Sequence, residues 1–342
     1  MSRVDVVIPN YQYGSYLLQC VDSVLRQDVA GLRVLIIDNA STDHSVEVAQ
    51  RITAQDARVQ LIAHEKNMGH VGSINEGIDW ASSEYFMMLC SDDVLAGGAL
   101  GRALDVMDKN REIVICQGDY RHFCGNEEAD FDQIQSEAAA RIYSGAQYIQ
   151  ELCRSPMASK GNFFVTRTEA QKKAGHYRPS LPHTCDLEMV LRLCGLGQFA
   201  ELPTIQGFRR LHGHNIANEC RDSRLLRLSA VANAFESFFA HDGRLLRDAP
   251  ELETEVRKRL ASQGYWAGAA HLIAGQRQAA RELFDFAFAQ SHRCRYLPPV
   301  GALLSTRLPN RISLALGDTR TGIASKHLAR ADREGAAAAS LR

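Results

Sequence analysis

The sequence lacks long hydrophobic runs, Cys-x-x-Cys pairs and any marked excess of charge of one sign. Its 342 residues carry a net charge of −1, so no global field attracts nucleic acid or an anionic membrane. The nine cysteines are scattered and odd in number, which indicates neither a disulfide framework nor a zinc site. These absences argue against nucleic acid as a partner and favour a reducing cytoplasm.

Signals for membrane insertion and export are absent as well. No stretch reaches the roughly 18 consecutive apolar residues that a transmembrane helix needs. Residues 1–8 place an acid inside a short apolar run, unlike a signal peptide. With 45% hydrophobic and 23% charged residues, the composition is typical of a globular protein with a sizeable core. We therefore expect a cytoplasmic protein.

What the chain does have is an alternation of strand and helix signals over its first hundred residues. Amphipathic segments separate short apolar runs that are typical of buried strands, at 4–8, 32–37, 59–62 and 85–90. Ser15 is expected to cap the first helix, and Ser41 or Asp43 the second. Because strands joined through helices pair in parallel, the pattern predicts an α/β protein with a Rossmann-like, mostly parallel sheet flanked by helices.

Carboxylates follow two of these strands at the points where the strands end. Asp38 comes after the second strand, and Ser91-Asp92-Asp93 follows the apolar run 85–90. In open α/β sheets, ligands bind outside the carboxyl ends of the strands. Two adjacent carboxylates there can hold a divalent cation, Mn²⁺ or Mg²⁺, against a diphosphate. The alternative for this pair is a helix cap or a solvated loop.

Several segments, in order, resemble the nucleotide-binding half of family 2 glycosyltransferases, which are inverting enzymes with the GT-A fold. They are Ile8-Pro9-Asn10-Tyr11, the acidic strand end 38–43, Asn67-Met68-Gly69 with Asn75, and Ser91-Asp92-Asp93. The match covers about ninety residues, which is far more specific than one short motif. It implies the GT-A fold and a nucleotide-diphosphate sugar as the donor.

The resemblance also implies roles for these residues. Asp93 is expected to bind the metal and Asp92 to lie near the ribose. The Tyr11 ring can stack on a base, and the Asp38 carboxylate can accept the imide hydrogen of a pyrimidine, which favours UDP or dTDP. Turn and cap roles are the alternative for Pro9, Tyr11 and Asp38. The residues expected to bind the nucleotide sugar are Pro9, Tyr11, Asp38, Asn67, Gly69, Asn75, Asp92 and Arg210.

The catalytic base is sought in the second hundred residues. Cys185-Asp186 resembles the acidic segment that opens a helix in the family, and this implies that Asp186 takes the proton of the acceptor hydroxyl. Glu188 is the reserve, and a helix cap is the alternative for Asp186. The chain departs from its relatives at Cys185, where they often have Glu, and at Cys90, where many carry a further acid. We assign Cys90 no role.

A closing segment, Arg210-Leu211-His212, resembles the Arg-x-His segment of the family. The resemblance implies that Arg210 binds the diphosphate and that His212 joins Asp93 as a metal ligand, since arginine forks onto phosphate oxygens and a neutral imidazole can ligate a cation. Without the resemblance, an exposed basic segment would be the simpler interpretation.

The expected domains are a GT-A catalytic domain at 1–218, with a nucleotide-binding half (1–100) and an acceptor half (101–218), a helical region at 219–316, and a flexible tail at 317–342. Residues 270–287 resemble one helical hairpin of a tetratricopeptide unit. For the helical region, packing on the catalytic domain, homo-oligomer formation and peripheral contact with the inner face of the membrane remain alternatives.

The sequence thus predicts an inverting glycosyltransferase that moves a sugar from a UDP- or dTDP-sugar to a hydroxyl of a saccharide or lipid-linked saccharide, in synthesis of surface polysaccharide or glycoconjugate. One alternative is a nucleotidyltransferase, which usually needs a basic, Gly-rich loop after the first strand; residues 9–14 contain no cation. Another is a catalytically inactive scaffold that binds nucleotide sugars, which the departures at Cys90 and Cys185 keep open.

Overall fold

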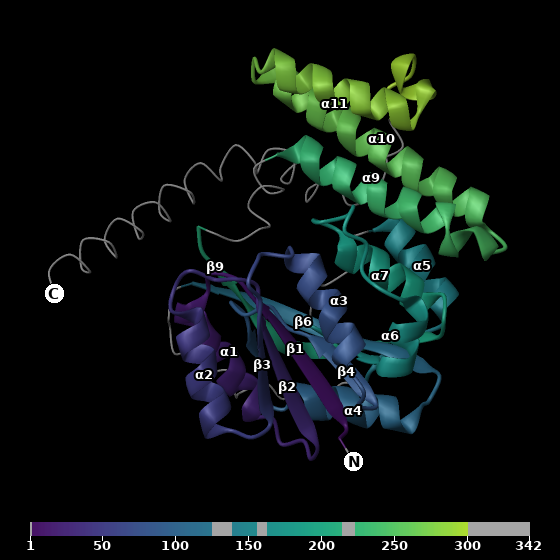
Figure 1. The fold of residues 1–342 in the computed structure, drawn as a ribbon. Helices are drawn as coiled ribbons and strands as arrows, with labels where there is room; N and C mark the ends of the chain where they lie inside the picture. The colour runs from purple at the N-terminus through teal and green to yellow at the C-terminus, as the bar shows by residue number, and fades with distance from the viewer. Residues whose placement is uncertain (1, 125–138, 156–162, 214–222, 300–342) are drawn as a thin grey trace, which may run out of the picture. The chain divides into compact units, whose positions relative to one another are not determined.

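A nine-stranded mixed sheet organises the first of two units in this computed structural model (Figure 1). The structure describes residues 2–124, 139–155, 163–213 and 223–299. Contacts divide the chain into one unit formed by Met1–Leu211 and Ala234–Ala249, and another formed by His212–Asn233 and Pro250–Arg342. The predicted domain boundary at 218 and the predicted tail at 317–342 lie outside the described residues.

The amino-terminal part of the sheet is parallel, as the sequence predicts. Its strands lie in the order β3-β2-β1-β4, and they are β1 (Val4–Asn10), β2 (Leu32–Asp38), β3 (Val59–Ala63) and β4 (Tyr85–Met88). The helices that connect them are α1 (Gly14–Leu25), α2 (Ser45–Gln55) and α3 (His70–Trp80). Every residue of β1 is buried, as expected of a strand covered on both faces, and this includes Asp5, whose carboxylate pairs with Arg33.

Antiparallel strands complete the sheet on the other side of β4. The strand β8 (Phe164–Arg167) pairs antiparallel with both β4 and β6 (Ile113–Cys124). Next to β6 runs β9 (Gln198–Leu211), parallel to it. Two short strands, β5 (Val94–Leu95) and β7 (Arg141–Tyr143), pair antiparallel with β9. Because β5 directly follows Asp92 and Asp93, this pairing brings the end of β9 beside the two carboxylates.

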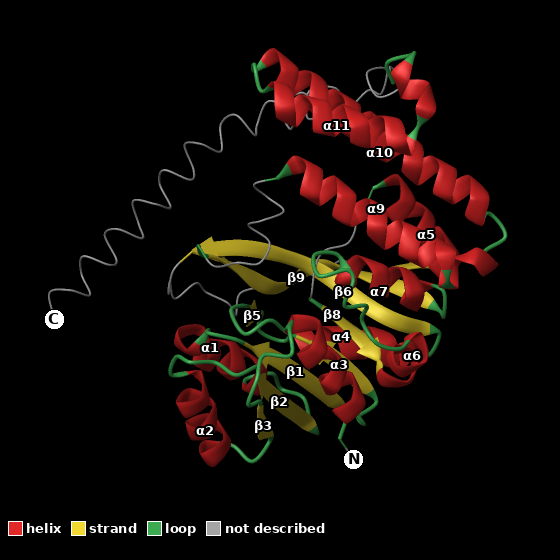
Figure 2. Ribbon diagram, turned by 45° about the horizontal axis from the view of Figure 1, so that its top comes forward, coloured by secondary structure: helices red, strands yellow, loops and turns green. Residues whose placement is uncertain are grey.

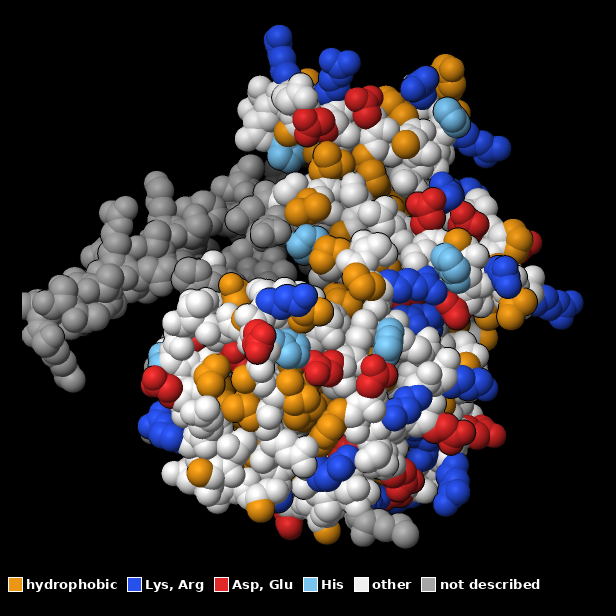
Figure 3. Space-filling model, in the orientation of Figure 1, with side chains coloured by type: hydrophobic (Ala, Val, Ile, Leu, Met, Phe, Trp, Pro, Cys, Tyr) orange, Lys and Arg blue, Asp and Glu red, His pale blue; other side chains and the backbone are white. Residues whose placement is uncertain are grey.

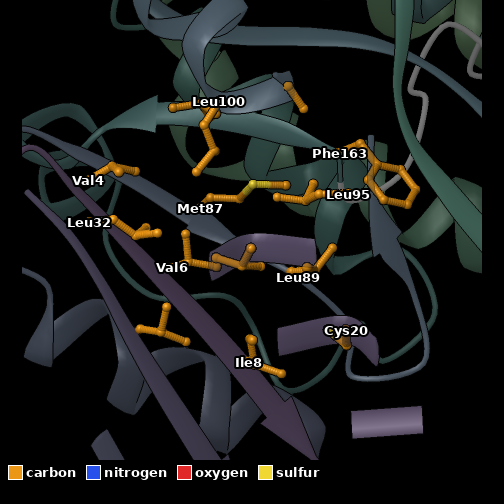
Figure 4. Close-up of a cluster of buried hydrophobic side chains, with 14 of the residues drawn as sticks. Val4, Val6, Ile8, Cys20, Leu32, Met87, Leu89, Leu95, Leu100 and Phe163 are labelled. Carbon is orange, nitrogen blue, oxygen red and sulfur yellow. The ribbon is translucent and has the colours of Figure 1, made fainter. Parts of the chain in front are cut away.

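Helices cover both faces of the sheet (Figure 2). Alternate residues of β1, namely Val4, Val6 and Ile8, join a buried cluster with α1, α2 and α4 (Ala99–Lys109), part of which Figure 4 shows. Val7 points to the other face and packs against Gly77 of α3. The remaining helices of the first unit include α5 (Gly145–Arg154), α6 (Thr168–Ala174) and α7 (Cys185–Cys194).

The helix starts differ from those expected. Ser15 is not a cap, because α1 begins at Gly14 and its capping position, Tyr13, makes no side-chain bond to the helix. His44 holds the capping position of α2, again without such a bond. Asp43 instead serves both helices, since its carboxylate accepts hydrogen bonds from the amides of Gly14 and Ser45, each at 3.0 Å. The sequence identified the residue but not its double role.

The described residues after β9 form helices, as the sequence predicts. They are α9 (Arg224–Ala240), α10 (Ala249–Ile273) and α11 (Arg277–Gln290), with 3₁₀ turns at Asp242–Leu245 and His292–Arg295. Gly275, where φ is +77°, lies between α10 and α11, so residues 270–287 contain the end of one helix and the start of the next. The rings of Tyr265 and Phe284 hold α10 against α11, with centroids 5.3 Å apart. None of the described helices is long and apolar enough to cross a membrane.

Positive and negative side chains intermingle on the face of the molecule shown in Figure 3, and no large area of its coloured residues carries one sign. This distribution agrees with the net charge of −1.

The contact between α3 and β1 leaves no room for a side chain at Gly77, where an added Cβ would lie 2.4 Å from a methyl carbon of Val7. We expect Gly77→Ala to lower the free energy of unfolding by about 1–3 kcal/mol. The matched control is Gly101→Ala in α4, where an added Cβ meets no atom within 4 Å and alanine favours the helix. Denaturant unfolding checks both; equal stabilities would contradict the packing described here.

Candidate active site

The loops that leave β1 and β2 are tied to each other at the carboxyl edge of the sheet. Asn10 donates a hydrogen bond of 2.8 Å to one oxygen of Asp38, and the amide of Ser41 donates to the other at 2.9 Å. The amide of Gln12 donates to the Ser41 hydroxyl at 2.9 Å. The buried Asp38 keeps lone pairs for a further donor, and beside this loop pair the Tyr11 side chain is exposed.

Both loops contain a residue in the left-handed region of backbone space. Gln12 has φ of 61° and Ala40 has φ of 62°, and no other described residue apart from glycine has a positive φ. Such conformations cost roughly 1–2 kcal/mol per residue and persist where surrounding bonds enforce them. Here the Gln12 side chain supplies two of those bonds, donating to the Thr42 hydroxyl at 2.8 Å and accepting from the Asp43 amide at 3.1 Å.

Asn39, which the sequence analysis did not select, organises the loop before α3. Its side-chain nitrogen donates a hydrogen bond to the Asn67 side chain at 2.8 Å, and its side-chain oxygen accepts one from the backbone amide of Met68 at 2.7 Å. Asn67 in turn accepts the amide of Gly69, whose φ of 81° glycine adopts without strain. The predicted residues Asn67 and Gly69 are thereby fixed beside the end of β2.

Asn75 of α3 bonds to the protein backbone. Its carboxamide pairs with the backbone of Tyr177 on both sides, accepting from the amide at 2.7 Å and donating to the carbonyl at 2.9 Å. It therefore ties α3 to the segment before α7. Its predicted contact with the nucleotide sugar stays a prediction.

Asp92 and Asp93 are buried at the end of β4, and Arg210 from β9 holds them in place. The Arg210 amide donates to an Asp93 carboxylate oxygen at 3.1 Å, and its guanidinium donates to the Asp92 carbonyl at 3.0 Å and to Gln19. The guanidinium lies 4.5 Å from the Tyr16 ring centroid and 4.4 Å from that of Phe123. Arg210 is only 1% exposed, so its predicted contact with the diphosphate has no support from the geometry.

The carboxylate pair fits a hard divalent cation. One ligand atom each from Cys90, Asp92 and Asp93 lies within 4.8 Å of the others. Burial, followed by the charge of Asp92, raises the pKa of Asp93 well above its usual value, although the Arg210 amide opposes the shift. A cation at this position would remove the repulsion between the two charges. Carboxylate oxygens suit Mg²⁺ and Mn²⁺, whereas the Cys90 thiol does not.

Two side chains near Asp92 escaped the sequence analysis because neither belongs to a recognised pattern. Tyr13 precedes α1, and burial together with the charge of Asp92 raises the pKa of its hydroxyl. His70 is the first residue of α3, and burial lowers the pKa of its imidazole while the charge of Asp92 opposes that shift. A neutral imidazole and a neutral phenol therefore lie near the predicted ribose-binding carboxylate.

Asp186 lies in the first turn of α7, where it is partly exposed and is not the capping residue. Its Oδ1 accepts the Leu187 amide at 2.8 Å. Burial raises the pKa of Asp186, and the Leu187 amide and the charge of Arg209 oppose the shift. Such an environment suits a group that must accept a proton.

Glu188, the reserve candidate, is fully buried in an ion-pair network. Its carboxylate oxygens lie 2.8 Å from Arg192 and 2.9 Å from Arg178. Arg178 also pairs with Asp242 at 2.8 Å. The structure thus gives Glu188 a role in holding α7 in place rather than a position open to an acceptor.

His212 is the first residue of the second unit, so its predicted role as a metal ligand stays a prediction. The residue that the sequence analysis passed over in this segment is Arg209. It is half-buried, and its charge acts on both Asp93 and Asp186. The doublet Arg209-Arg210 was visible in the sequence, but which of the two arginines is buried depends on the orientation of β9.

Comparison with known proteins identifies the family of the chain. Residues 5–172 match the sequence model of the family described as glycosyl transferase family 2. The chain is 31% identical to "Glycosyltransferase GlyG" of Streptococcus pneumoniae over 121 residues, which cover 35% of this chain and 40% of that protein. It is 26% identical to "Chondroitin synthase" of Pasteurella multocida over 230 residues, 67% of this chain and 23% of the synthase. The chain thus spans less than half the length of these relatives.

Two solved structures share the fold. One is Staphylococcus aureus TarS in complex with UDP-GlcNAc, with a TM-score of 0.56 at 14% identity over 83% of this chain and 90% of that one. The other is the mannosyltransferase PcManGT of Pyrobaculum calidifontis in complex with GDP-Man and Mn²⁺, with a TM-score of 0.56 at 16% identity over 97% of this chain and 86% of that one. These likenesses confirm the predicted GT-A fold.

Because Glu188 is paired with two arginines and Asp186 forms no ion pair with any residue that the structure describes, substitutions at the two positions should change the free energy of unfolding by different amounts. Glu188→Gln leaves Arg178 and Arg192 facing a neutral group, and we expect it to lower the free energy of unfolding by about 3 kcal/mol. Asp186→Asn is the matched control, because no ion pair of Asp186 is lost, and its stability should stay within about 1 kcal/mol of the wild type. Denaturant unfolding compares them, and equal effects would contradict the assignment.

Proposed function

Because the chain belongs to glycosyltransferase family 2, we propose that it moves a sugar from a nucleotide-diphosphate donor to a hydroxyl acceptor with inversion at the transferred carbon. The observation that carries the proposal is the buried pair Asp92 and Asp93, held by Arg210 at the carboxyl edge of the sheet. A pair of like charges in this position is suited to a cation that faces a diphosphate. The strand before this pair, β4, lies next to β1, and β1 lies next to β2, so the pair and the residues proposed to bind the nucleotide follow neighbouring strands.

The donor is a UDP- or dTDP-sugar in this proposal. The exposed Tyr11 ring would stack on the base, while Asp38, whose carboxylate is fixed by Asn10 and Ser41, would accept the imide hydrogen. Pro9 lies near the end of β1, and Asn67 and Gly69 belong to the loop before α3. The complex of TarS with UDP-GlcNAc supports a uridine donor, whereas PcManGT was solved with GDP-Man.

A divalent cation, Mn²⁺ or Mg²⁺, completes the site. Asp93 and His212 would hold it, with Asp92 near the ribose. When bound, the cation would neutralise charge on the leaving diphosphate. The Mn²⁺ in the PcManGT structure supports this part of the proposal, as does the fit of two buried carboxylates to a hard ion.

Asp186 is the proposed catalytic base. One of its oxygens is held by the Leu187 amide, which leaves the other to accept the proton of the acceptor hydroxyl. Its raised pKa increases its basicity, and the charge of Arg209 opposes that rise. Glu188 is engaged by Arg178 and Arg192 and takes no part in this step.

The acceptor is proposed to be a saccharide or lipid-linked saccharide, used in the cytoplasm for surface polysaccharide or glycoconjugate synthesis. The similarity to a chondroitin synthase supports this, although the chain spans 23% of that relative. Contact with the membrane or a second copy of the chain through the carboxyl-terminal helices belongs to the same proposal. A screen of nucleotide sugars for metal-dependent release of free nucleotide would identify the donor.

Loss of the metal carboxylate should remove metal-dependent binding. We expect Asp93→Ala to weaken the affinity for UDP in the presence of Mn²⁺ by roughly 100-fold, because the cation links the protein to the diphosphate. Calorimetry with and without Mn²⁺ measures this effect. Asp105→Ala, at an exposed carboxylate of α4, is the control and should bind as the wild type does. An unchanged Mn²⁺-dependent affinity in Asp93→Ala would remove Asp93 from the metal site.

The role proposed for Asp186 predicts how the rate of transfer depends on pH. Since the pKa of Asp186 is raised, transfer should fall with decreasing pH at a midpoint above the ordinary aspartate pKa of about 3.9, because the protonated carboxyl cannot accept a proton. Asp186→Asn should keep donor affinity and lower kcat by roughly 10²–10⁴-fold. Steady-state rates over a range of pH check both points. Wild-type kcat in this variant would place the base elsewhere.

A further inference from the structure

His64 begins the loop 64–69, which carries Asn67 and Gly69, two residues proposed to bind the nucleotide. It follows β3, and its backbone amide donates a hydrogen bond of 2.9 Å to the carbonyl of Asp38 at the end of β2. The side chain is 15% exposed, so its imidazole lies mostly inside this edge of the protein. The proposed transfer reaction gives this imidazole no role of its own.

Both ring nitrogens of His64 face an oxygen. Nε2 lies 2.7 Å from a carboxylate oxygen of Glu76 in α3, and Nδ1 lies 3.2 Å from the side-chain oxygen of Asn39. A neutral imidazole has one N–H donor and one acceptor nitrogen, whereas an imidazolium has two donors. An acceptor oxygen at each nitrogen therefore matches the imidazolium.

The hydrogen bonds of Asn39 fix which of its side-chain atoms faces the ring. The backbone amide of Met68 donates to this atom at 2.7 Å, so the atom is the oxygen, because a carboxamide nitrogen accepts no hydrogen bond. The other side-chain atom donates to Asn67 Oδ1 at 2.8 Å, and the Gly69 amide identifies that oxygen by donating to it at 2.8 Å. Turning the Asn39 carboxamide over would break both bonds. The Asn39 oxygen is thus an acceptor, and His64 must donate to it.

Removing one proton from the ring leaves one of its two contacts repulsive. If the remaining proton is on Nδ1, the lone pair of Nε2 faces the Glu76 carboxylate. If it is on Nε2, the lone pair of Nδ1 faces the Asn39 oxygen. Because Asn39 is buried, solvent relieves such a contact poorly. The loop 64–69 is then held by one hydrogen bond fewer.

The other ionisable side chains on the elements around His64 are engaged elsewhere or exposed. The carboxylate of Asp38 on β2 accepts hydrogen bonds from Asn10 and Ser41. Asp79 on α3 pairs with His176 at 2.8 Å. The rest are Glu65 and Lys66 in the loop and Glu47 and Arg51 on α2, which are exposed, and His70 on α3, whose pKa is lowered by burial. Glu76 is the charged side chain that acts on the ring at contact distance.

We propose that His64 is a positioning residue whose doubly protonated ring holds Asn39, and through it the loop 64–69, in the shape that binds the nucleotide. This inference rests on the proposed function and adds to it a dependence of nucleotide affinity on the charge of one side chain. The bond to Asn39 is fully present at acidic pH and is lost as the pH rises through the range, about 5 to 8, in which histidine changes charge.

Glu76→Gln tests this proposal, because a carboxamide serves either form of the ring. It accepts from Nε2 of the imidazolium through its oxygen and donates to Nε2 of the neutral ring through its nitrogen, so Nδ1 keeps its proton for Asn39. We expect the UDP affinity of Glu76→Gln, divided by that of the wild type, to rise about 5-fold between about pH 6 and about pH 8.5, as the loss of one hydrogen bond implies. Calorimetry with Mg²⁺ measures both affinities.

The ratio of affinities removes the titration of UDP itself and of every group that the two proteins share. A ratio that stays constant over this pH range would overturn the proposal. Asp79→Asn is the matched control, because Asp79 and His176 form the same kind of pair, with the carboxylate on the same helix and without a bond to Asn39. Its affinity relative to the wild type should not change with pH.

His64→Ala separates positioning from a merely structural role. We expect it to bind UDP about 5-fold more weakly than the wild type at about pH 6, and as the wild type does at about pH 8.5, where the wild type has also lost the bond. An equal loss at both pH values would show that the imidazole only fills space, and would overturn the proposal. Circular dichroism confirms that each variant is folded at both pH values.

The ring can also be observed without a ligand. In ¹⁵N NMR spectra, with the signals of His64 assigned by their loss in His64→Ala, both ring nitrogens should be protonated at about pH 6. An unprotonated ring nitrogen at that pH would overturn the proposal.

The outcomes distinguish this inference from the proposed function. A wild type that binds none of UDP, dTDP and GDP at either pH would overturn both. A wild type that binds one of them, together with a constant ratio for Glu76→Gln, would overturn only the role of His64.

Discussion

The structure of the site depends on the burial of two adjacent carboxylates. Burying one charge without a partner is costly, and burying two like charges together is more so. The arrangement persists because Arg210 fixes the loop. Its backbone amide donates to the Asp93 carboxylate, and its guanidinium donates to the Asp92 carbonyl and packs between the rings of Tyr16 and Phe123. Arg210 reaches that place only because β9 runs alongside β6 to the carboxyl edge and pairs with β5.

The two acidic residues of α7, Asp186 and Glu188, are only two positions apart but face different sides of the helix. Residues two apart on an α-helix point about 200° from each other, so Asp186 and Glu188 cannot face the same surroundings. Glu188 points into the protein and neutralises Arg178 and Arg192, which fix the segment before the helix. Asp186 points to the other side, where it remains partly exposed.

The sequence predicted the features that follow from local patterns. The parallel strands β1 to β4 are recognisable as apolar runs, and Asp38, Asp92 and Asp93 stand out because they follow such runs. The insertion of β8 and the pairing of β6 with β9 join residues far apart in the chain, and no local pattern records them. The pairing of β9 also decides which arginine of the doublet is buried beside the carboxylates, so the position of Arg210 could not be known in advance.

The strained residues Gln12 and Ala40 bear on how this protein could be engineered to withstand heat. Glycine at either position would relieve the local strain, and a search for better backbone geometry would select it. The same change would raise the conformational entropy of the unfolded chain and make the two loops more mobile. Ligand binding would then have to order these loops, which costs conformational entropy. Thermostability is therefore better sought away from this edge of the sheet, where added rigidity and ligand recognition do not compete.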